Sequence, residues 1–424
     1  MRARHFLALA VLLFFAGAMV YPLSYVLSQA FVVDGTPSLA YFHTMLSSAF
    51  FRDVLFNSMN LAIAVTALSS AIAYPIALLM SRYDIPKRGY IHALLLLPLV
   101  SPPFVGALGV RQIFSRFGSA NIFLMHSGVI DRPIQWLGSG SVFGIIALQT
   151  IHLVPILYLT ISASLRSAHS SLEEAASLCG ASRWQVLRRV IIPLSFPGWF
   201  AGASLVFIAS FTDLGTPLIF ECRNLIPVQI YNMLSDLHEN PVGYSFVVFT
   251  CVLCLALFAL SQSAMSDGSY AGSARAKQVR LNSPISGARR YVVSLLLFTY
   301  IGLSIFPQLT VVALSLSKEW FFTVFPSAWT LTHFSEVLSH PMTSHSLLVS
   351  IGLSLCTSVL TVIFGFATAY LIARTRGVGS RAFELLSIVP LAIPGIVFAF
   401  GYIGAFAGTF LDNRINPFPL LIAA

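Results

Sequence analysis

The chain has 424 residues, of which 57% are hydrophobic and only 9% are charged. Soluble globular domains contain about a quarter charged residues, so this composition excludes that class and is typical of a protein that spans a bilayer. A net charge of +9 can indicate a nucleic-acid partner, but none is expected here, because the basic residues lie mostly in short segments between apolar runs.

The first predicted element is an N-terminal helix. Residues 1–31 have a basic start, an apolar run and the sequence Ala-Gly-Ala at 16–18, a pattern that cleaved signal peptides share. The apolar run continues past Ala18 to Phe31, which is long enough to cross a bilayer. We therefore expect a retained membrane helix.

Further apolar runs follow along the whole chain, and they predict an all-α polytopic membrane protein with about nine transmembrane helices. Several runs contain proline, which membrane helices tolerate when neighbouring helices satisfy the freed backbone groups. The predicted spans are 6–29, 56–80, 90–113, 141–164, 191–212, 243–262, 291–315, 346–372 and 382–410.

Charge placement predicts the topology. With the N-terminus inside, 17 of the 24 basic residues fall in inner segments, and most acidic residues fall outside. This bias is what the positive-inside rule describes. It predicts a multi-pass protein of the cell inner membrane with a cytoplasmic N-terminus, and it places residues 165–190 in the cytoplasm.

No catalytic constellation, metal site or cofactor is indicated. The histidines are scattered, and the Cys251-x-x-Cys254 pair lies in an apolar run without further ligands, which favours small apolar helix residues over a redox or metal site. The three lysines, Lys87, Lys277 and Lys318, do not follow glycine, so none belongs to a phosphate-binding P-loop. The chain is therefore expected not to be an enzyme.

The chain also repeats itself. Residues 81–109 match residues 373–401 without gaps at an offset of 292, which pairs Pro98 with Pro390 and Gly109 with Gly401. Further upstream, Pro22 matches Pro307 after a short length change. These matches indicate duplication of one membrane module, and the two copies are parallel because both enter the membrane from the same side.

Three parts are predicted from this repeat. The first module is 1–262, with a core transmembrane domain at about 57–262, and a Gly/Ser-rich cytoplasmic linker follows at 263–290. The second module is 291–424, which stops before its counterpart of residues 171–193. We expect this second module to be incomplete and transport to require a complementing C-terminal piece. A frameshift, a truncation and a split gene remain open as causes.

Residues 171–193 form a long polar stretch between apolar runs. Ser171 and Glu174 have the spacing of a helix capping box, Gly180 is expected to end that helix at a closely packed, positive-φ turn, and Ser182 with Gln185 forms a second box. The first helix has an apolar face: Leu172, Ala175, Ala176 and Cys179. This favours an ordered helical pair with a cytoplasmic protein partner over a solvated loop, and the flanking spans argue against a DNA-reading helix-turn-helix.

The same stretch resembles the EAA loop of binding-protein-dependent ABC importer permeases, in which Glu-Ala-Ala, a glycine and an aliphatic-proline end recur at this spacing. The tandem duplication is similar to the ferric-iron and thiamine branch, as is the sequence FTDLGTPLIFE at 211–221. The resemblance implies a permease for a solute, ferric iron first and thiamine or another small solute as the alternative. It implies an extracytoplasmic solute-binding protein and a separate ATP-binding subunit as partners. The coupling residues it implies are Glu174, Ala175, Ala176, Gly180, Arg188 and Pro193.

Two charged residues near the membrane ends, Asp213 and Arg111, are candidates for the transport pathway, although both lie where snorkelling to the interface also suffices. Asn57, Gln149 and His152 are expected to form hydrogen bonds between helices. A secondary transporter driven by an ion gradient is the alternative class. It is disfavoured because the spans carry almost no charges at mid-membrane.

Overall fold

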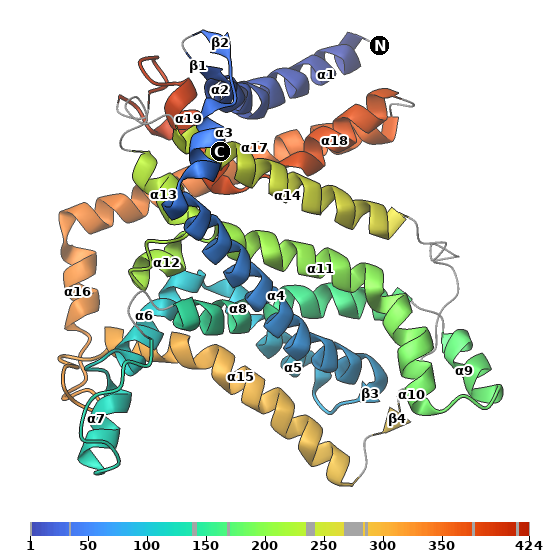
Figure 1. Cartoon of the computed structure of the whole chain (residues 1–424), viewed down its shortest axis with the longest axis vertical. Helices are drawn as coiled ribbons and strands as arrows, with labels where there is room; N and C mark the ends of the chain where they lie inside the picture. Colours follow the sequence, from blue (N-terminus) through green and yellow to red (C-terminus); the bar gives the residue numbers. More distant parts are fainter. Residues whose placement is uncertain are drawn as a thin grey trace. The chain divides into compact units, whose positions relative to one another are not determined.

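The structure is a computed structural model that describes residues 2–33, 35–137, 142–167, 170–234, 242–266, 283–284, 287–374, 378–412 and 415–423. Its elements are almost all helical, which confirms the predicted all-α class. By its internal contacts the chain forms two compact units, which Figure 1 shows in one view. The first unit contains residues 1–55, 226–256 and 331–424, and the second contains residues 56–225 and 257–330.

The first unit is built from the N-terminal helices and most of the C-terminal ones. Its elements are α1 (Arg2–Phe15), the π-helix η1 (Ala16–Val20), α2 (Tyr21–Phe31), the short strands β1 (Val32–Val33) and β2 (Thr36–Pro37), α3 (Ala40–Ser47), the start of α4 (Ala49–Arg82), α13 (Ile226–Met233), most of α14 (Val242–Ser266), α16 (Thr332–Ser339), α17 (Pro341–Arg374), α18 (Val378–Ala392), α19 (Gly395–Ala405) and α20 (Phe418–Ala423).

The second unit carries both candidate functional regions. Its elements are the rest of α4, β3 (Tyr83–Asp84), α5 (Arg88–Leu96), the 3₁₀ helix η2 (Leu97–Val100), α6 (Pro103–Phe114), α7 (Ser119–His126), α8 (Val142–Ser167), α9 (Ser170–Leu178), α10 (Arg183–Val186), the π-helix η3 (Leu187–Ile191), α11 (Ile192–Thr212), α12 (Gly215–Ile219), the end of α14, β4 (Ser283–Pro284) and α15 (Ala288–Ser315). In this unit α8 and α11 lie side by side (Figure 1), and their apolar residues form the centre of the core.

The described residues contain seven helices that are long and apolar enough to cross a membrane, and nine spans if each of two bent helix pairs is one span. Each predicted span overlaps one of these nine. The third and ninth are not the continuous helices that the sequence predicted. The pair Arg88–Val100 and Pro103–His126 is bent by 89°, and the pair Ser380–Pro390 and Gly395–Ala405 by 98°.

Proline explains the break in the third span. Pro102 has φ −60° and ψ 144°, an extended conformation, and Pro103 then begins α6. Proline lacks an N–H group and disfavours helical geometry in the residue before it, so two consecutive prolines end one helix and start another. Pro394 has nearly the same angles, φ −62° and ψ 142°, before α19.

Helix boundaries recur at the 292-residue offset found in the sequence. Adding 292 to the bounds of α3 and α4 gives those of α16 and α17. The same shift takes Pro103, the first residue of α6, to Gly395, the first residue of α19. The two stretches therefore share local structure as well as sequence. The predicted linker at 263–290 lies largely outside the described residues.

The first long helix of each sequence repeat packs on a helix of the other repeat. Each compact unit therefore contains residues from both repeats. In the second unit α15 packs closely on α6, and a Cβ atom on Gly109 would lie 2.1 Å from the carbonyl oxygen of Pro307. In the first unit α2 packs on α19, and a Cβ atom on Gly401 would lie 3.1 Å from Pro22. The matched glycines and prolines of the sequence thus meet pairwise in the fold.

Hydroxyl groups reinforce the contact in the first unit. Tyr402 Oη donates to the carbonyl oxygen of Ala18 at 2.6 Å, and Tyr21 Oη donates to that of Ala405 at 3.2 Å. Small residues that let backbones approach, together with hydrogen bonds between helices, stabilise helix pairs in a bilayer, where burial of apolar surface contributes little.

The close contact at Gly109 predicts a steric penalty. Gly109→Ala places a methyl group against the Pro307 backbone, and we expect a loss of about 1–3 kcal/mol, as for other overpacked positions. Gly302→Ala, on α15 with nothing within 4 Å of the added Cβ, is the matched control and is expected to be neutral or slightly stabilising. Thermal unfolding in detergent measures both, and equal melting temperatures for the two variants would contradict the packing described.

Candidate functional site

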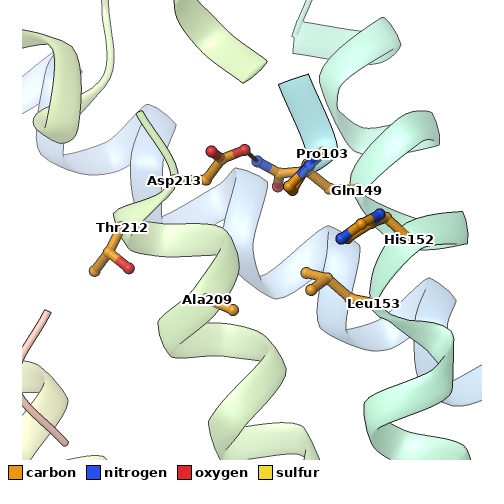
Figure 2. Close-up of a pocket in the computed structure, with 7 residues that line it drawn as sticks. All are labelled: Pro103, Gln149, His152, Leu153, Ala209, Thr212 and Asp213. Carbon is orange, nitrogen blue, oxygen red and sulfur yellow. Dashed lines mark hydrogen bonds between the residues drawn. The ribbon is translucent and has the colours of Figure 1, made fainter. Parts of the chain in front are cut away.

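A cavity with polar side chains in its lining lies in the second unit at the C-terminal end of α11. Its volume is about 140 Å³. Figure 2 shows its walls, which come from α6, from α8 and from the end of α11. The lining residues are Pro103, Gln149, His152, Leu153, Ala209, Thr212 and Asp213.

Asp213 is held at this cavity by three hydrogen bonds. Its Oδ1 accepts from the backbone N–H groups of Gly215 and Thr216 at 3.1 and 3.4 Å, and its Oδ2 accepts from Gln149 Nε2 at 2.8 Å. Ser210 Oγ in turn donates to Gln149 Oε1 at 2.6 Å. The predicted role of Gln149 in joining helices is confirmed, because it connects α8 with α11 and the residue that follows it.

His152 differs from the prediction. Its side chain is 7% exposed, and its imidazole forms no hydrogen bond with any residue that the structure describes. Figure 2 shows the ring pointing from α8 toward α11. Asn57 on α4 likewise has no hydrogen-bond partner within the described ranges. The hydrogen bonds between helices that the sequence predicted for these two residues are therefore not seen.

Arg111, the other predicted pathway residue, does not line the cavity. Its NH1 donates to the carbonyl oxygen of Ile219 at 2.9 Å, and its NH2 forms an ion pair with Glu221 Oε1 at 2.7 Å. Half of the Arg111 side chain is exposed. The structure therefore does not bring Asp213 and Arg111 together into one site.

The second candidate region is the helical segment 170–193 at the other end of α11. Its first helix, α9, begins at Ser170, one residue before the predicted cap. Gly180 ends α9 with φ +83°, its N–H donates to the carbonyl oxygen of Ser177, and the N–H of Ala181 donates to that of Ala176, both at 3.0 Å. This is the Schellman pattern, which requires a left-handed residue.

Gly180 is needed for its backbone conformation and not for close packing. A Cβ atom there would meet nothing within 4 Å in the described chain. The predicted positive φ is confirmed, whereas the predicted close packing is wrong. L-residues other than asparagine and aspartate rarely adopt this conformation, which explains the glycine.

The second helical start has the capping box that the sequence predicted. Gln185 N donates to Ser182 Oγ at 3.3 Å, and Ser182 N donates to Gln185 Oε1 at 2.8 Å, which completes a capping box at α10. The π-helix η3 follows, and Pro193 lies in the first turn of α11. The wider π turn accommodates a proline that cannot donate a helical hydrogen bond.

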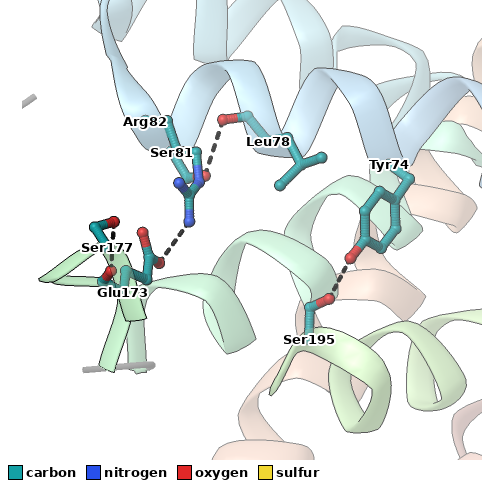
Figure 3. A network of polar contacts seen from close by, with 7 residues as sticks. All are labelled: Tyr74, Leu78, Ser81, Arg82, Glu173, Ser177 and Ser195. Carbon is teal, nitrogen blue, oxygen red and sulfur yellow. Dashed lines mark hydrogen bonds and ion pairs between the residues drawn. The ribbon is translucent and has the colours of Figure 1, made fainter. Parts of the chain in front are cut away.

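Segment 170–193 is fixed to the bundle by α4. Arg82 at the end of α4 forms an ion pair with Glu173 on α9, and Ser177 Oγ donates to the carbonyl oxygen of Glu173 at 2.8 Å (Figure 3). Deeper in the bundle, Tyr74 on α4 forms a hydrogen bond with Ser195 on α11. The sequence analysis did not predict this ion pair, although Glu173 occupies the first turn of α9, where carboxylates are favoured.

Glu174 and the apolar residues beside it point to solvent. Leu178 is 89% exposed, Trp184 is 66% exposed and Leu172 is 48% exposed. We call the following residues the α9 face: Leu172, Glu174, Ala175, Leu178, Cys179 and Trp184, all exposed.

The apolar face predicted for α9 is split between solvent and the bundle. Ala176 packs against the bundle core, whereas Leu172, Ala175 and Cys179 lie on the α9 face. Arg188 and Pro193 are also exposed.

Residues 73–267 match the family described as binding-protein-dependent transport system inner membrane component. The putative ferric transport system permease protein FbpB 1 of Haemophilus influenzae is 26% identical, over 94% of this chain and 63% of the relative. The ferric transport system permease protein FbpB of Actinobacillus pleuropneumoniae is 25% identical, over 94% of this chain and 58% of the relative. The chain thus spans less than two thirds of either ferric relative.

A solved bacterial ABC transporter involved in the import of the acidic polysaccharide alginate matches 61% of this chain and 94% of its own, with 18% identity and a TM-score of 0.49. The spermidine/putrescine transport system permease protein PotB of Escherichia coli is 32% identical over 197 residues, which cover 45% of this chain and 71% of PotB. Together with the family match, this identity shows that the chain belongs to the family of binding-protein-dependent transport system inner membrane components.

Proposed function

We propose that the chain is the permease subunit of an ABC importer for ferric iron. An extracytoplasmic binding protein delivers the iron, and a separate cytoplasmic ATP-binding subunit supplies the energy. The observation that carries this proposal is the α9 face, a set of exposed apolar residues on an ordered, capped helical segment. Exposed apolar residues grouped in this way are typical of a protein contact.

We propose ferric iron as the substrate, and not spermidine or putrescine, because the ferric relatives match a larger share of this chain than PotB does. The two ferric relatives align with 94% of this chain, including the second repeat, whereas PotB aligns with 45%. The single-chain repeat is therefore shared with the ferric relatives over nearly its whole length.

Motion of the ATP-binding subunit reaches the bundle mainly through packing. A partly exposed ion pair such as Arg82–Glu173 contributes about 0–1 kcal/mol. Val186 and Ile191 are both buried against the bundle core, so this part of the segment cannot move without moving its neighbours. We therefore propose that α10, η3 and the start of α11 transmit the motion of the ATP-binding subunit. The Arg82–Glu173 ion pair sets the orientation of α9.

The second module is proposed to bind helices equivalent to α8 and α11. On α4, Ser69 Oγ donates to the carbonyl oxygen of Thr150 on α8, and Ser70 accepts from Trp199 on α11. On α17 the position equivalent to Ser70 is Val362, which is 69% exposed, and the position equivalent to Tyr74 is Phe366, which is 74% exposed. These positions are those through which α4 holds its partner helices.

Disrupting the α9 face should separate the two subunits without unfolding the permease. Glu174→Lys and Leu178→Glu change exposed side chains, so we expect normal membrane insertion and about a tenfold or greater loss of the co-purified ATP-binding subunit. Gly180→Val should act in the same direction by straining the turn, whereas Gly180→Asn, which tolerates positive φ, should retain most of the association. Wild-type levels of association in both Glu174→Lys and Leu178→Glu would contradict the assigned contact.

Cysteine labelling tests the proposed orientation. Cys179 is exposed, so a variant that retains only this cysteine should react with an impermeant maleimide in inside-out vesicles and not in right-side-out vesicles. A cysteine-free chain with Ser127→Cys, in the exposed segment after α7, should show the opposite pattern. Labelling of Cys179 from the outside would reverse the topology proposed from the charge bias.

Reconstitution tests the substrate. Vesicles containing the chain, the ATP-binding subunit and the binding protein loaded with radioactive iron(III) should take up iron with ATP when a fragment supplying the equivalents of α8 to α11 is also present. ATP-dependent uptake of thiamine or spermidine instead of iron would contradict the proposed substrate. Iron uptake at the same rate without the added fragment would contradict the role proposed for the exposed side of α17.

A further inference from the structure

The cavity lies at the opposite end of α11 from segment 170–193. α11 has 21 residues, which at 1.5 Å per residue span about 30 Å, roughly the thickness of the hydrocarbon core. Three polar side chains in the lining of the cavity, Gln149, His152 and Asp213, require an explanation, because polar groups inside a transmembrane bundle are costly unless they are paired or functional.

His152 is the first group that packing alone does not explain. The residue is more than nine-tenths buried, lines the cavity and has no hydrogen-bond partner among the described residues. The ring nitrogens are not among the fully buried atoms that lack a partner, so they are open to the cavity, where water or an ion can reach them. Its ring points across the cavity toward α11 (Figure 2).

Asp213 is the second group. Asp213 caps the short helix α12 through Oδ1, which accepts from the N–H groups of Gly215 and Thr216. This structural role explains the position of Oδ1. It does not account for Oδ2, which faces Gln149 at the cavity and still has a lone pair free beyond that one bond. No lysine or arginine of the described chain forms an ion pair with Asp213, since Arg111 pairs with Glu221.

The break between η2 and α6 provides independent support. Pro103, the first residue of α6, lines the same cavity, and the chain bends by 89° at this point. Non-helical backbone at membrane depth is tolerated where it is buried in protein or lines a water-filled cavity. Discontinuous helices beside polar side chains are typical of substrate sites in transporters.

We propose that this cavity is a transient subsite for a partly hydrated metal cation in the transport pathway, which rests on the iron-import function proposed above. A carboxylate oxygen of Asp213 and an imidazole nitrogen of His152 would supply two ligands, and water the remainder. The described residues contain no group of three or more His, Cys, Asp or Glu side chains arranged to hold a metal. Two protein ligands give weak binding, as conduction requires, because the ion must also leave.

The test measures iron uptake and ATP hydrolysis together in the reconstituted importer, with the binding protein loaded with radioactive iron(III). His152→Gln and Asp213→Asn should lower uptake about tenfold or more, while ATP hydrolysis stimulated by the loaded binding protein continues. Thr150→Val is the control. Thr150 is buried on α8, does not line the cavity, and its hydroxyl group has no partner among the described residues.

The outcomes separate the two proposals. Iron uptake by both variants at the rate of the Thr150→Val control would overturn the subsite and leave the import function standing. Equal losses of uptake and ATP hydrolysis in both variants would also overturn it, because they would indicate a structural role. No iron uptake by the unaltered protein with the added fragment present would contradict the import function and the subsite with it.

A second measurement avoids variants that fail to fold. Thr212 lines the cavity, and Thr212→Cys in a chain without the five native cysteines introduces a thiol that can be modified after assembly. Modification with a positively charged aminoethyl methanethiosulfonate should block iron uptake about tenfold, and the neutral methyl reagent should block it less. Equal uptake after either reagent and without reagent would overturn the subsite.

Discussion

The close approach of α6 to α15 at Gly109 and Pro307 is the constraint that joins the first helix of the second repeat to the second unit. A methyl group on Gly109 would come within 2.1 Å of the Pro307 carbonyl oxygen, so the backbones are in direct contact. Lipid tails are as apolar as leucine, so helices in a bilayer associate through such packing and through hydrogen bonds. Gly401 makes the equivalent contact with Pro22 in the first unit, so both units contain the same glycine–proline helix contact.

α11 links the two candidate functional regions. Its N-terminal start is continuous with η3 and α10, and Asp213 follows its far end at the cavity. α4 and α8 hold it along its length through Ser70–Trp199 and through the Gln149–Ser210 bond. α11 is therefore a continuous helix, held by both neighbours, between segment 170–193 and Asp213.

Much of this fold could be predicted from sequence, because each prediction rested on local chemistry or on length. Apolar runs gave the positions of the spans, and the capping box at Ser182 and the positive φ of Gly180 followed from the residue types alone. The break at Pro102 was missed because membrane helices also accommodate proline without bending sharply, as α4 does at Pro75 and α8 at Pro155. The role predicted for His152 was wrong and the Arg82–Glu173 pair was not predicted, because distant segments make the environment of both.

Contact between the α9 face and the ATP-binding subunit is the central claim, and photo-cross-linking from Cys179 tests it most directly. With the other four cysteines replaced, a benzophenone attached to the exposed Cys179 should form an adduct with the ATP-binding subunit in inside-out vesicles of the assembled importer. The same reagent on Ser127→Cys should form none with that subunit. Failure of the Cys179 probe to form the adduct, or equal yields from both positions, would contradict the coupling role of segment 170–193.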